Sequence, residues 1–378
     1  MGMKKIWAFL CLSLLNGCWS FLEAESFKSE WKKAEVKKVM QSVADWQIEH
    51  FKEVPYSRNN WINAAMYLGM FEWGRMADTL DKNPKYLQFL YKIGNQTGWQ
   101  PEKRMYHADD ICVSQLYIDL YRHSAQKNKN MLNPTIARTD WVISHPSKGS
   151  MNLNHRDGST LERWSWCDAL FMAPPVYARL YAMTGDKKYI RFMNRNYKDT
   201  YEFLYSKADS LFYRDANYFH QQEPNGAKMF WSRGNGWVLG GLCQILDELP
   251  AKDKHRKFYE ELFISLCKRI VRCQQADGYW HASLLDPGSY PAPETSGTGF
   301  FVYALAYGIN RGYLPEAEYR PIVEKGWKAM VEAVWPDGKL GFVQPVGESP
   351  KKVTKEMTEA YGVGAFLLAG CEIYQLSR

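Results

Sequence analysis

The sequence predicts an all-helical fold, an (α/α)6 barrel of six helical hairpins with short β-hairpins at one rim. Three observations lead to this prediction. An apolar segment recurs six times along the chain, amphipathic segments lie between its copies, and two Asp-Gly turns occur at matching places in neighbouring repeats. Together they indicate a set of buried helices surrounded by a set of exposed ones.

The six apolar segments each begin with polar or small residues and continue with Gly, Ala and aromatic residues. Their starts are separated by 49, 58, 65, 64 and 62 residues, and a near-constant period of this length is typical of a repeated helical hairpin. Six units with Gly-rich inner helices favour a closed ring, with an open solenoid as the alternative. The segments are aligned on Trp61, Asp110, Asp168, Arg233, Gly297 and Glu359.

The stretches between these segments are more charged. In residues 27–51, 189–205, 257–274 and 319–334, apolar residues recur every three to four positions, with charged residues on the other face. This spacing predicts amphipathic helices that face water on one side.

Two Asp-Gly pairs predict the β-hairpins. Asp277 and Asp337 lie 60 residues apart, and each is followed by Gly, a short extended run and Pro. Asp-Gly between extended runs is typical of a tight hairpin. We expect both hairpins to connect an outer helix to an inner one at the same rim.

Residues 1–18 have the pattern of an export signal, because two lysines precede a short apolar run from Ile6 to Leu15. Leu15 to Cys18 are similar to a bacterial lipobox, which would make Cys18 a lipidated residue; plain secretion with cleavage nearby is the alternative. We therefore expect an exported protein of a Gram-negative bacterium, periplasmic or anchored to the membrane by a lipid. Residues 19–378 are predicted to form a single catalytic domain.

Composition restricts the partners. The formal net charge is +7 and no dense block of Lys and Arg occurs, so a nucleic-acid partner is not expected. The 15 Trp exceed what a core usually needs, and Trp in a cleft stacks on sugar rings. The 8 Cys include no CxxC pair, and no His pair has zinc-ligand spacing, so we expect neither a metal nor a cofactor.

Asp168 is the main candidate for chemistry. It stands between Trp166, Cys167 and the apolar residues from Leu170 to Met172, at the start of a helical segment. A carboxylate in such surroundings is costly and needs either a partner or a proton. A carboxylic acid that keeps its proton near neutral pH is what general acid catalysis requires. The alternative is that Asp168 caps the helix.

Helix starts at one rim of a barrel would bring polar and aromatic residues together in a cleft. Arg suits the carboxylate of an acidic sugar, Trp its ring faces, and Asp the transfer of a proton. The sequence therefore predicts an acidic oligosaccharide as substrate. The residues expected at this cleft are Trp61, His107, Asp109, Asp110, Asp168, Trp231, Arg233, Asn235, Trp237 and the pair Thr295-Ser296.

Three parts of the chain resemble a known family: residues 166–175, residues 230–237 and the Asp-Gly turns. They are similar to the unsaturated rhamnogalacturonyl hydrolases of glycoside hydrolase family 105, which are related to the unsaturated glucuronyl hydrolases of family 88. The resemblance extends over roughly residues 30–375. It implies an (α/α)6 barrel that removes a 4,5-unsaturated uronic acid from the non-reducing end of oligosaccharides left by lyases, pectic rhamnogalacturonan among their sources.

The resemblance also implies roles for single residues. Asp168 matches the proton donor and Asp110 the second acidic residue, although the adjacent Asp109 leaves that register open. Trp231, Arg233 and Trp237 match sugar-binding positions. Where some members have a binding His, this chain has Arg214, with His220 further on, which leaves the exact sugar open. Trp61, His107 and Asp109 complete the set of expected substrate-binding residues.

Two other classes of function remain open from the residues. The first is another (α/α)6 carbohydrate enzyme, an epimerase or an inverting glycosidase, although the 8 scattered His disfavour an epimerase. The second is a glycan-binding lipoprotein without activity. Such a protein needs aromatic residues but no desolvated Asp, so Asp168 separates it from an enzyme.

Overall fold

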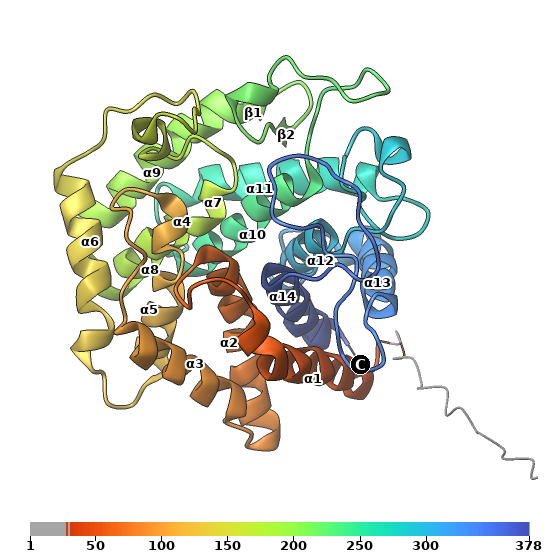
Figure 1. Cartoon of the computed structure of the whole chain (residues 1–378), viewed down its shortest axis with the longest axis horizontal. Coiled ribbons are helices and arrows are strands. Elements are labelled where there is room, and N and C mark those ends of the chain that lie inside the picture. The colour runs from red at the N-terminus through yellow and green to blue at the C-terminus, as the bar shows by residue number, and fades with distance from the viewer. Residues whose placement is uncertain (1–27, 29–30, 378) are drawn as a thin grey trace, which may run out of the picture.

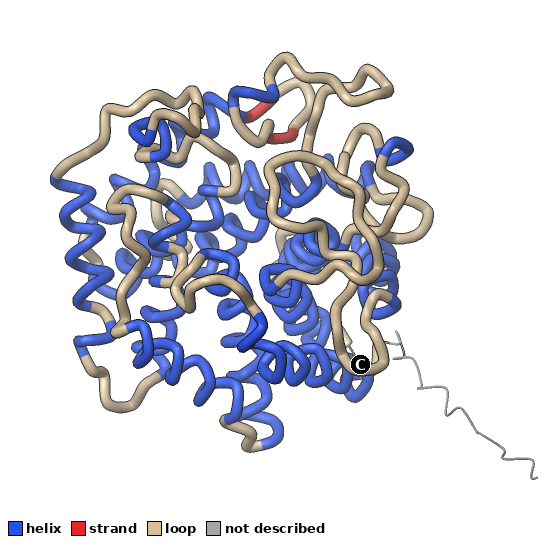
Figure 2. Tube along the Cα trace, in the orientation of Figure 1, coloured by secondary structure: helices blue, strands red, loops and turns tan. Residues whose placement is uncertain are grey.

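The computed structural model describes residue 28 and residues 31–377, which form two concentric layers of helices (Figure 1, Figure 2). The predicted export signal and Cys18 lie outside the described residues. Within 31–377, six helices form an inner ring and six more exposed ones surround it, as the alternation of apolar and amphipathic segments predicts. The expected (α/α)6 barrel is confirmed.

The inner ring is closed. Each inner helix packs against the next, and the last, α14, packs against both α12 and α2. Glycines allow this contact, because a Cβ added at Gly364 would lie 2.2 Å from the Ala65 carbonyl oxygen on α2. The inner helices are α2 (Trp61–Asp81), α5 (Ser114–His123), α8 (Pro174–Thr184), α10 (Ser232–Glu248), α12 (Thr295–Asn310) and α14 (Ala360–Leu376).

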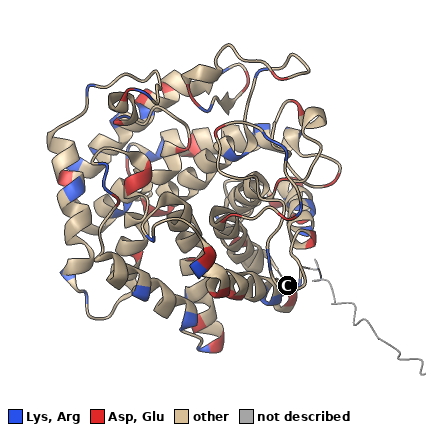
Figure 3. Cartoon of the chain, in the orientation of Figure 1, with Lys and Arg blue, Asp and Glu red and all other residues tan. Residues whose placement is uncertain are grey.

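The outer helices bury one face each and leave the other in water. In α9, for example, Tyr189, Phe192, Met193 and Tyr197 are buried at helical spacing. Acidic and basic residues are interspersed along the outer helices (Figure 3). The outer helices are α1 (Lys33–Glu49), α3 (Lys85–Thr97), α6 (Asn133–Ser144), α9 (Lys187–Leu204), α11 (Arg256–Ile270) and α13 (Glu316–Glu332).

Two inner helices are preceded by a single extra turn. Helix α4 (Ala108–Ile111) leads into α5, and α7 (Ala169–Met172) leads into α8, where Pro174 and Pro175 begin the longer helix. These short turns lie at the same rim as the starts of the other inner helices (Figure 1). The repeat positions Asp110 and Asp168 therefore fall at helix starts, as their alignment with Trp61 and Arg233 predicts.

The two Asp-Gly turns form as predicted, and an antiparallel bridge between Val334 and Leu340 spans the second, although neither turn joins two regular strands. Gly278 and Gly338 adopt φ of 92° and 99°, which suits glycine in a tight turn. The backbone after Asp277 pairs elsewhere, because the Ser232 amide donates to the Ala282 carbonyl and the Leu284 amide to the Phe230 carbonyl. The one regular ladder within the described residues joins β1 (Tyr205–Ser206) to β2 (Leu211–Phe212), antiparallel, between α9 and α10.

Aromatic side chains fill the middle of the barrel. Trp237 is fully buried, and its ring centroid lies 4.8 Å from that of Phe171 and 4.5 Å from that of Phe300. This cluster separates the two ends of the ring, so the barrel is packed and is not a channel.

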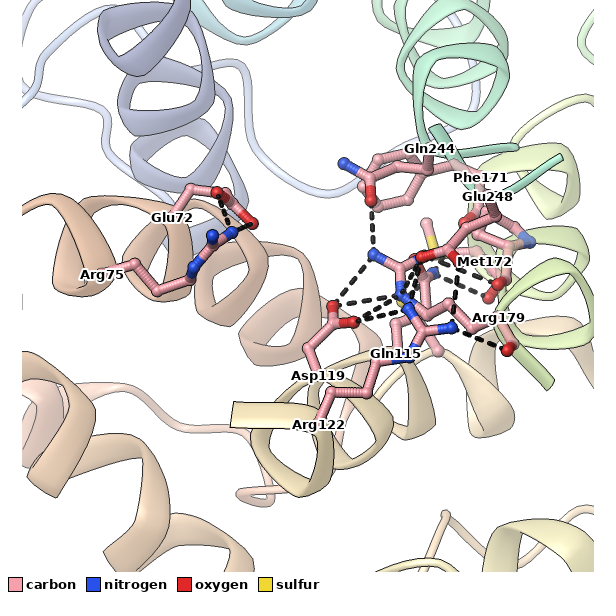
Figure 4. Close-up of polar contacts among 12 residues, drawn as sticks. Glu72, Arg75, Gln115, Asp119, Arg122, Phe171, Met172, Arg179, Gln244 and Glu248 are labelled. Atoms are coloured by element: carbon pink, nitrogen blue, oxygen red, sulfur yellow. Dashed lines mark hydrogen bonds and ion pairs between the residues drawn. The ribbon is translucent and has the colours of Figure 1, made fainter. Parts of the chain in front are cut away.

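Ion pairs connect the helices at the far end of the barrel, where the inner helices finish (Figure 4). Arg179 Nε donates to both Asp119 oxygens at 3.0 Å, and Arg122 Nη1 donates to Glu248 Oε1 at 2.6 Å. These side chains line a cavity of about 700 Å³. Because its charged groups are paired with one another, this cavity is a structural feature that ties α5, α8 and α10 together.

None of the helices within the described residues is both long enough and apolar enough to cross a membrane.

Candidate active site

A cavity of about 320 Å³ lies at the opposite end, where the inner helices begin. Its walls are aromatic and its polar groups are charged, a combination that suits an anionic sugar. A loop between α13 and α14, residues 344–351, forms one side and is called the mouth loop below. The lining residues are Trp61, Asp109, Trp166, Asp168, Met172, Arg214, Trp231, Arg233, Trp237, Val346, Gly347, Glu348 and Lys351.

The aromatic walls come from several helix starts. Trp61, the first residue of α2, stacks on Tyr361 of α14 with ring centroids 5.6 Å apart and an interplanar angle of 16°. Trp237 forms the floor. Trp231, just before α10, is held by its Nε1, which donates to Gln344 Oε1 at 3.1 Å. All three Trp expected at the cleft therefore line this one cavity.

Asp168 faces the cavity from the residue before α7 and is buried. Its side chain makes no hydrogen bond that caps the helix, although it stands at the N-cap position. Burial raises the pKa of its carboxyl, while Arg214 and, to a smaller extent, Arg233 oppose the rise. The surroundings therefore favour the protonated acid more than water would.

Asp109 and Asp110 are adjacent in sequence but point to different surroundings. Asp109 lines the cavity, and its Oδ1 is buried with no hydrogen-bond partner among the described residues. Burial raises the pKa of Asp109 to about 7, with a further contribution from the nearby Asp168 carboxylate. Asp110 instead accepts hydrogen bonds from Arg104, at 2.7 Å from its backbone amide and 3.0 Å from Nε.

The two candidate histidines lie outside the cavity lining. His107 is buried and caps α4, where its Nδ1 accepts from the Asp109 amide at 3.2 Å. Burial lowers the pKa of His107 to about 4, with help from Arg104, so the ring is neutral at neutral pH. Its ring centroid lies 4.9 Å from that of Trp166, which does line the cavity. His220 is exposed on the turn after residues 216–218.

Arg214 reaches the cavity from the segment after β2. Its Nη1 donates to Asp215 Oδ2 at 2.7 Å and to Glu348 Oε2 at 2.9 Å. Its Nε lies 3.5 Å from Asp168 Oδ2 and has no hydrogen-bond partner among the described residues. One guanidinium thus lies among three carboxylates.

Arg233 is buried between two aromatic rings, with Cζ 4.3 Å from the Trp231 centroid and 4.8 Å from that of Tyr361. Its Nη1 donates to the Gln344 carbonyl at 2.7 Å and its Nη2 to the Pro345 carbonyl at 2.9 Å. The two terminal nitrogens therefore fix the base of the mouth loop, and the guanidinium brings its charge close to Asp168.

Sequence reasoning missed the mouth loop and Tyr361. Glu348 and Lys351 line the cavity, and Gln344 holds Trp231. The loop begins where the Asp337 run reaches Pro345, and its later residues, Glu348 and Lys351 among them, belong to neither repeated pattern. The available signal was its place directly before the sixth inner helix, at the rim that every helix start shares.

Within 31–377, no group of three or more His, Cys, Asp or Glu side chains is arranged to hold a metal ion. The chemistry that the cavity does offer is proton transfer, because two carboxyl groups with raised pKa lie beside aromatic rings and cations.

Comparison with known proteins agrees with this arrangement. The model of Glycosyl Hydrolase Family 88 matches residues 33–377. A protein of Formosa agariphila named "Unsaturated 3S-rhamnoglycuronyl hydrolase" is 38% identical over 354 residues, covering 91% of this chain and 92% of that protein.

Two solved structures have a TM-score of 0.80 with this chain and each cover 91% of it. One, described as a family 88 glycosyl hydrolase from Bacteroides vulgatus, is 32% identical and is covered over 99% of its length. The other, described as a polysaccharide lyase, is 33% identical and is covered over 98%. The chain belongs to Glycosyl Hydrolase Family 88, and the activity expected from its sequence, hydrolytic removal of an unsaturated uronic acid from lyase-generated oligosaccharides, is confirmed for it as a member of that family.

Proposed function

We propose that the chain acts on oligosaccharides in which the unsaturated uronic acid is linked to rhamnose, with Asp168 as the proton donor. The observation that supports this role best is the Asp168 carboxyl itself, which is buried, caps no helix and faces a cavity lined by Trp. A side chain kept for stability alone would not need this setting.

The substrate chemistry requires an acid of this kind. A 4,5-unsaturated uronate is an enol ether, because the ring oxygen is bonded to C5. Protonation of C4 by Asp168 gives an oxocarbenium ion at C5, and water adds there. The resulting hemiketal opens, and the bond to the next sugar breaks. The anomeric carbon is not attacked, so the usual rule relating carboxylate separation to stereochemistry does not apply.

We assign the second acidic role to Asp109. It shares the cavity with Asp168; burial raises the pKa of both carboxyls, and the neighbouring Asp168 carboxylate raises that of Asp109 further. When one of the two groups is protonated and the other ionised, one acid is available to donate and one carboxylate to orient water or ring hydroxyls. Asp110, which is bound to Arg104, supports the backbone that positions Asp109.

Three cations of the cavity lining support an acidic substrate: Arg214, Arg233 and Lys351. The terminal nitrogens of Arg233 are already engaged by the mouth loop. Its proposed contribution is therefore its charge and its hold on the loop, rather than a two-pronged grip on the sugar carboxylate.

Rhamnose as the neighbouring sugar is supported by the name of the Formosa agariphila relative. Pectic rhamnogalacturonan fragments also carry rhamnose and are the competing source of substrate. We infer the rhamnoglycuronyl type, with sulfate on the rhamnose, because it is the type named for a relative that shares 38% of its residues with this chain.

The test is a set of absorbance assays with oligosaccharides made by lyases. The conjugated double bond absorbs in the ultraviolet, and hydration removes it, so absorbance should fall. Three substrates are compared: unsaturated uronate on sulfated rhamnose, on rhamnose from rhamnogalacturonan, and on a sugar other than rhamnose. The fastest fall on the third would contradict the proposal.

The same assay distinguishes a hydrolase from a lyase, which is the class of enzyme named for one similar structure. A lyase creates the double bond, so absorbance would rise on the intact polysaccharide. Two acids with raised pKa suit proton donation better than the removal of a proton from C5. We expect no rise.

We further propose that the protein is exported and anchored through a lipid on Cys18. The support is the lipobox-like pattern at Leu15 to Cys18. Cys18→Ser should move the protein from the membrane fraction to the soluble one; a wild type that is already in the soluble fraction would favour plain secretion.

A further inference from the structure

We propose that Glu348 of the mouth loop is a positioning residue that keeps Asp168 protonated to higher pH by engaging Arg214. The inference rests on the proposed role of Asp168 as proton donor, and it assigns the mouth loop a part in the chemistry.

The geometry is a chain of three charged side chains. Glu348 Oε2 accepts from Arg214 Nη1 at 2.9 Å, and the Nε of the same guanidinium lies 3.5 Å from Asp168 Oδ2. Arg214 is largely buried, with 13% of its side chain exposed. A buried cation beside the donor acid favours the ionised carboxylate, which is the wrong form for protonating C4. A carboxylate on the other side of that cation opposes this effect.

Other charged and titratable groups also face Asp168. Asp109 on α4 acts in the same direction as Glu348, whereas Arg233 on α10 acts in the opposite one. Asp215 is fully buried and binds the same Nη1 of Arg214 as Glu348 does. The Cys167 thiol donates to Asp168 Oδ2 at 3.5 Å, and Lys351 lines the cavity from the mouth loop.

Of the two carboxylates that accept hydrogen bonds from Arg214, Glu348 is the one that can be changed with less effect on the fold. Its side chain is 42% exposed, and it belongs to a loop rather than to an inner helix. Asp215 is unsuitable for such a test, since it also caps a 3-10 turn by accepting from the Asn217 amide. Glu348 thus connects the mouth loop to Arg214, the cation next to the donor acid.

The expected change in the pH dependence of activity follows from the charges of Glu348 and Arg214. When Glu348 is made neutral, Asp215 alone offsets the charge of Arg214, so more of that charge acts on Asp168 and lowers the pKa of its carboxyl. The protonated form is the active one, so activity is lost at lower pH than in the wild type. At the acidic end of the profile both enzymes hold a protonated Asp168, and their rates should agree.

The experiment measures kcat/KM against pH by loss of double-bond absorbance, for the wild type and for Glu348→Gln. Glutamine keeps an oxygen that accepts from Arg214 and so preserves the loop contact without the charge. We expect the alkaline limb of Glu348→Gln to move to lower pH, so that its rate there falls about two- to five-fold, the scale of a partly exposed ion pair. At acidic pH the two rates should lie within about two-fold.

Two matched variants separate charge from structure. Glu348→Asp retains the charge and should restore the wild-type limb. His155→Gln removes the other partner of Glu348 Oε2, at 3.2 Å, without touching Arg214, and should leave the limb in place.

Hydrogen exchange of residues 344–351 completes the test, because an opened loop would hydrate Asp168 and shift the limb by itself. Protection equal to that of the wild type supports the proposal, and a loss of protection in Glu348→Gln overturns it. An unshifted limb in an active Glu348→Gln enzyme also overturns it while leaving the proposed function intact. If the wild type consumes no unsaturated oligosaccharide at all, the proposed function itself fails.

Discussion

Asp168 combines burial with the absence of any capping bond, so its replacement should affect chemistry far more than folding. Asp168→Asn keeps the size of the side chain but cannot donate the proton. General acid catalysis typically contributes 10²–10⁴-fold, so we expect kcat to fall by about that factor with little change in the melting temperature. Absorbance assays and thermal melts check this. A variant with near wild-type rate would remove Asp168 from the mechanism, and one that fails to fold would restore the capping alternative.

The neighbouring pair offers a comparison between adjacent residues. Asp109→Asn should lower kcat and leave stability unchanged or slightly higher, because it removes a buried carboxyl that repels Asp168. Asp110→Asn should instead lower stability by about 1 kcal/mol, since it weakens an ion pair whose Arg104 side chain is half exposed. Steady-state kinetics and denaturation of both variants provide the test. The reverse pattern would return the second acidic role to Asp110.

For single residues of the cavity, the sequence could indicate which helix starts meet but not the direction in which each side chain points. Trp61, Asp168 and Arg233 occupy repeat-related positions and line the cavity, as do Trp231 and Trp237 on either side of Arg233. Successive residues of a helical turn differ by about 100° in direction, so a one-residue shift in helix register decides between Asp109 and Asp110. Only the bond from Arg104, six residues earlier, reveals that register.

Among the elements, α2 and α14 depend on close backbone contact to complete the ring. A Cβ at Gly364 would lie 2.2 Å from the Ala65 carbonyl oxygen, which the two helices cannot accommodate without moving apart. We expect Gly364→Ala to lower the free energy of unfolding by about 1–3 kcal/mol through overpacking. Chemical denaturation measures the change. Gly288→Ala is the control, because its Cβ would meet nothing closer than 3.9 Å; equal losses in the two variants would contradict the explanation.

The order of helices was predictable because each inner helix is apolar nearly all round and each outer one on a single face. The pairing of the run after Asp277 was not predictable, since its partner is distant in sequence, whereas the Asp337 turn pairs Val334 with Leu340 locally, as its pattern indicates. The extended run after Asp277 finds its hydrogen bonds next to Phe230 and Ser232, on the segment that enters α10. Nothing in either stretch alone specifies the other as its partner.

For the molecule as a whole, buried acids make stability depend on pH. Burial raises the pKa of Glu72, Asp247 and Glu372 at the far end, as it does for Asp109 and Asp168 at the cavity. A group with a raised pKa holds its proton longer when folded, so the folded state binds more protons and stability falls as pH rises past the ordinary carboxyl range toward about 7.

His107 and His255 act in the opposite sense, because burial lowers the pKa of each ring and the folded state then binds fewer protons. The five acids outnumber these two histidines, and the melting temperature should therefore be higher at pH 5 than at pH 8. Thermal melts at the two pH values, with ionic strength held constant, check this. In Asp109→Asn the difference should shrink. A wild-type protein more stable at pH 8 would show that these carboxyls ionise in the fold as easily as in water.

The cluster of Trp237, Phe171 and Phe300 closes the inner end of the cavity. A cavity that is closed at its inner end admits the terminus of a sugar chain but not a stretch of its interior. The rate on a mixture of oligosaccharides should then follow the number of chain ends and not the mass of carbohydrate present. Each cut made by a lyase supplies one more chain end. At a fixed mass of carbohydrate, the rate of this enzyme should therefore rise with the number of cuts that the lyase has made. Halving the mean chain length should about double the turnover of a dilute, unsaturated-ended sample.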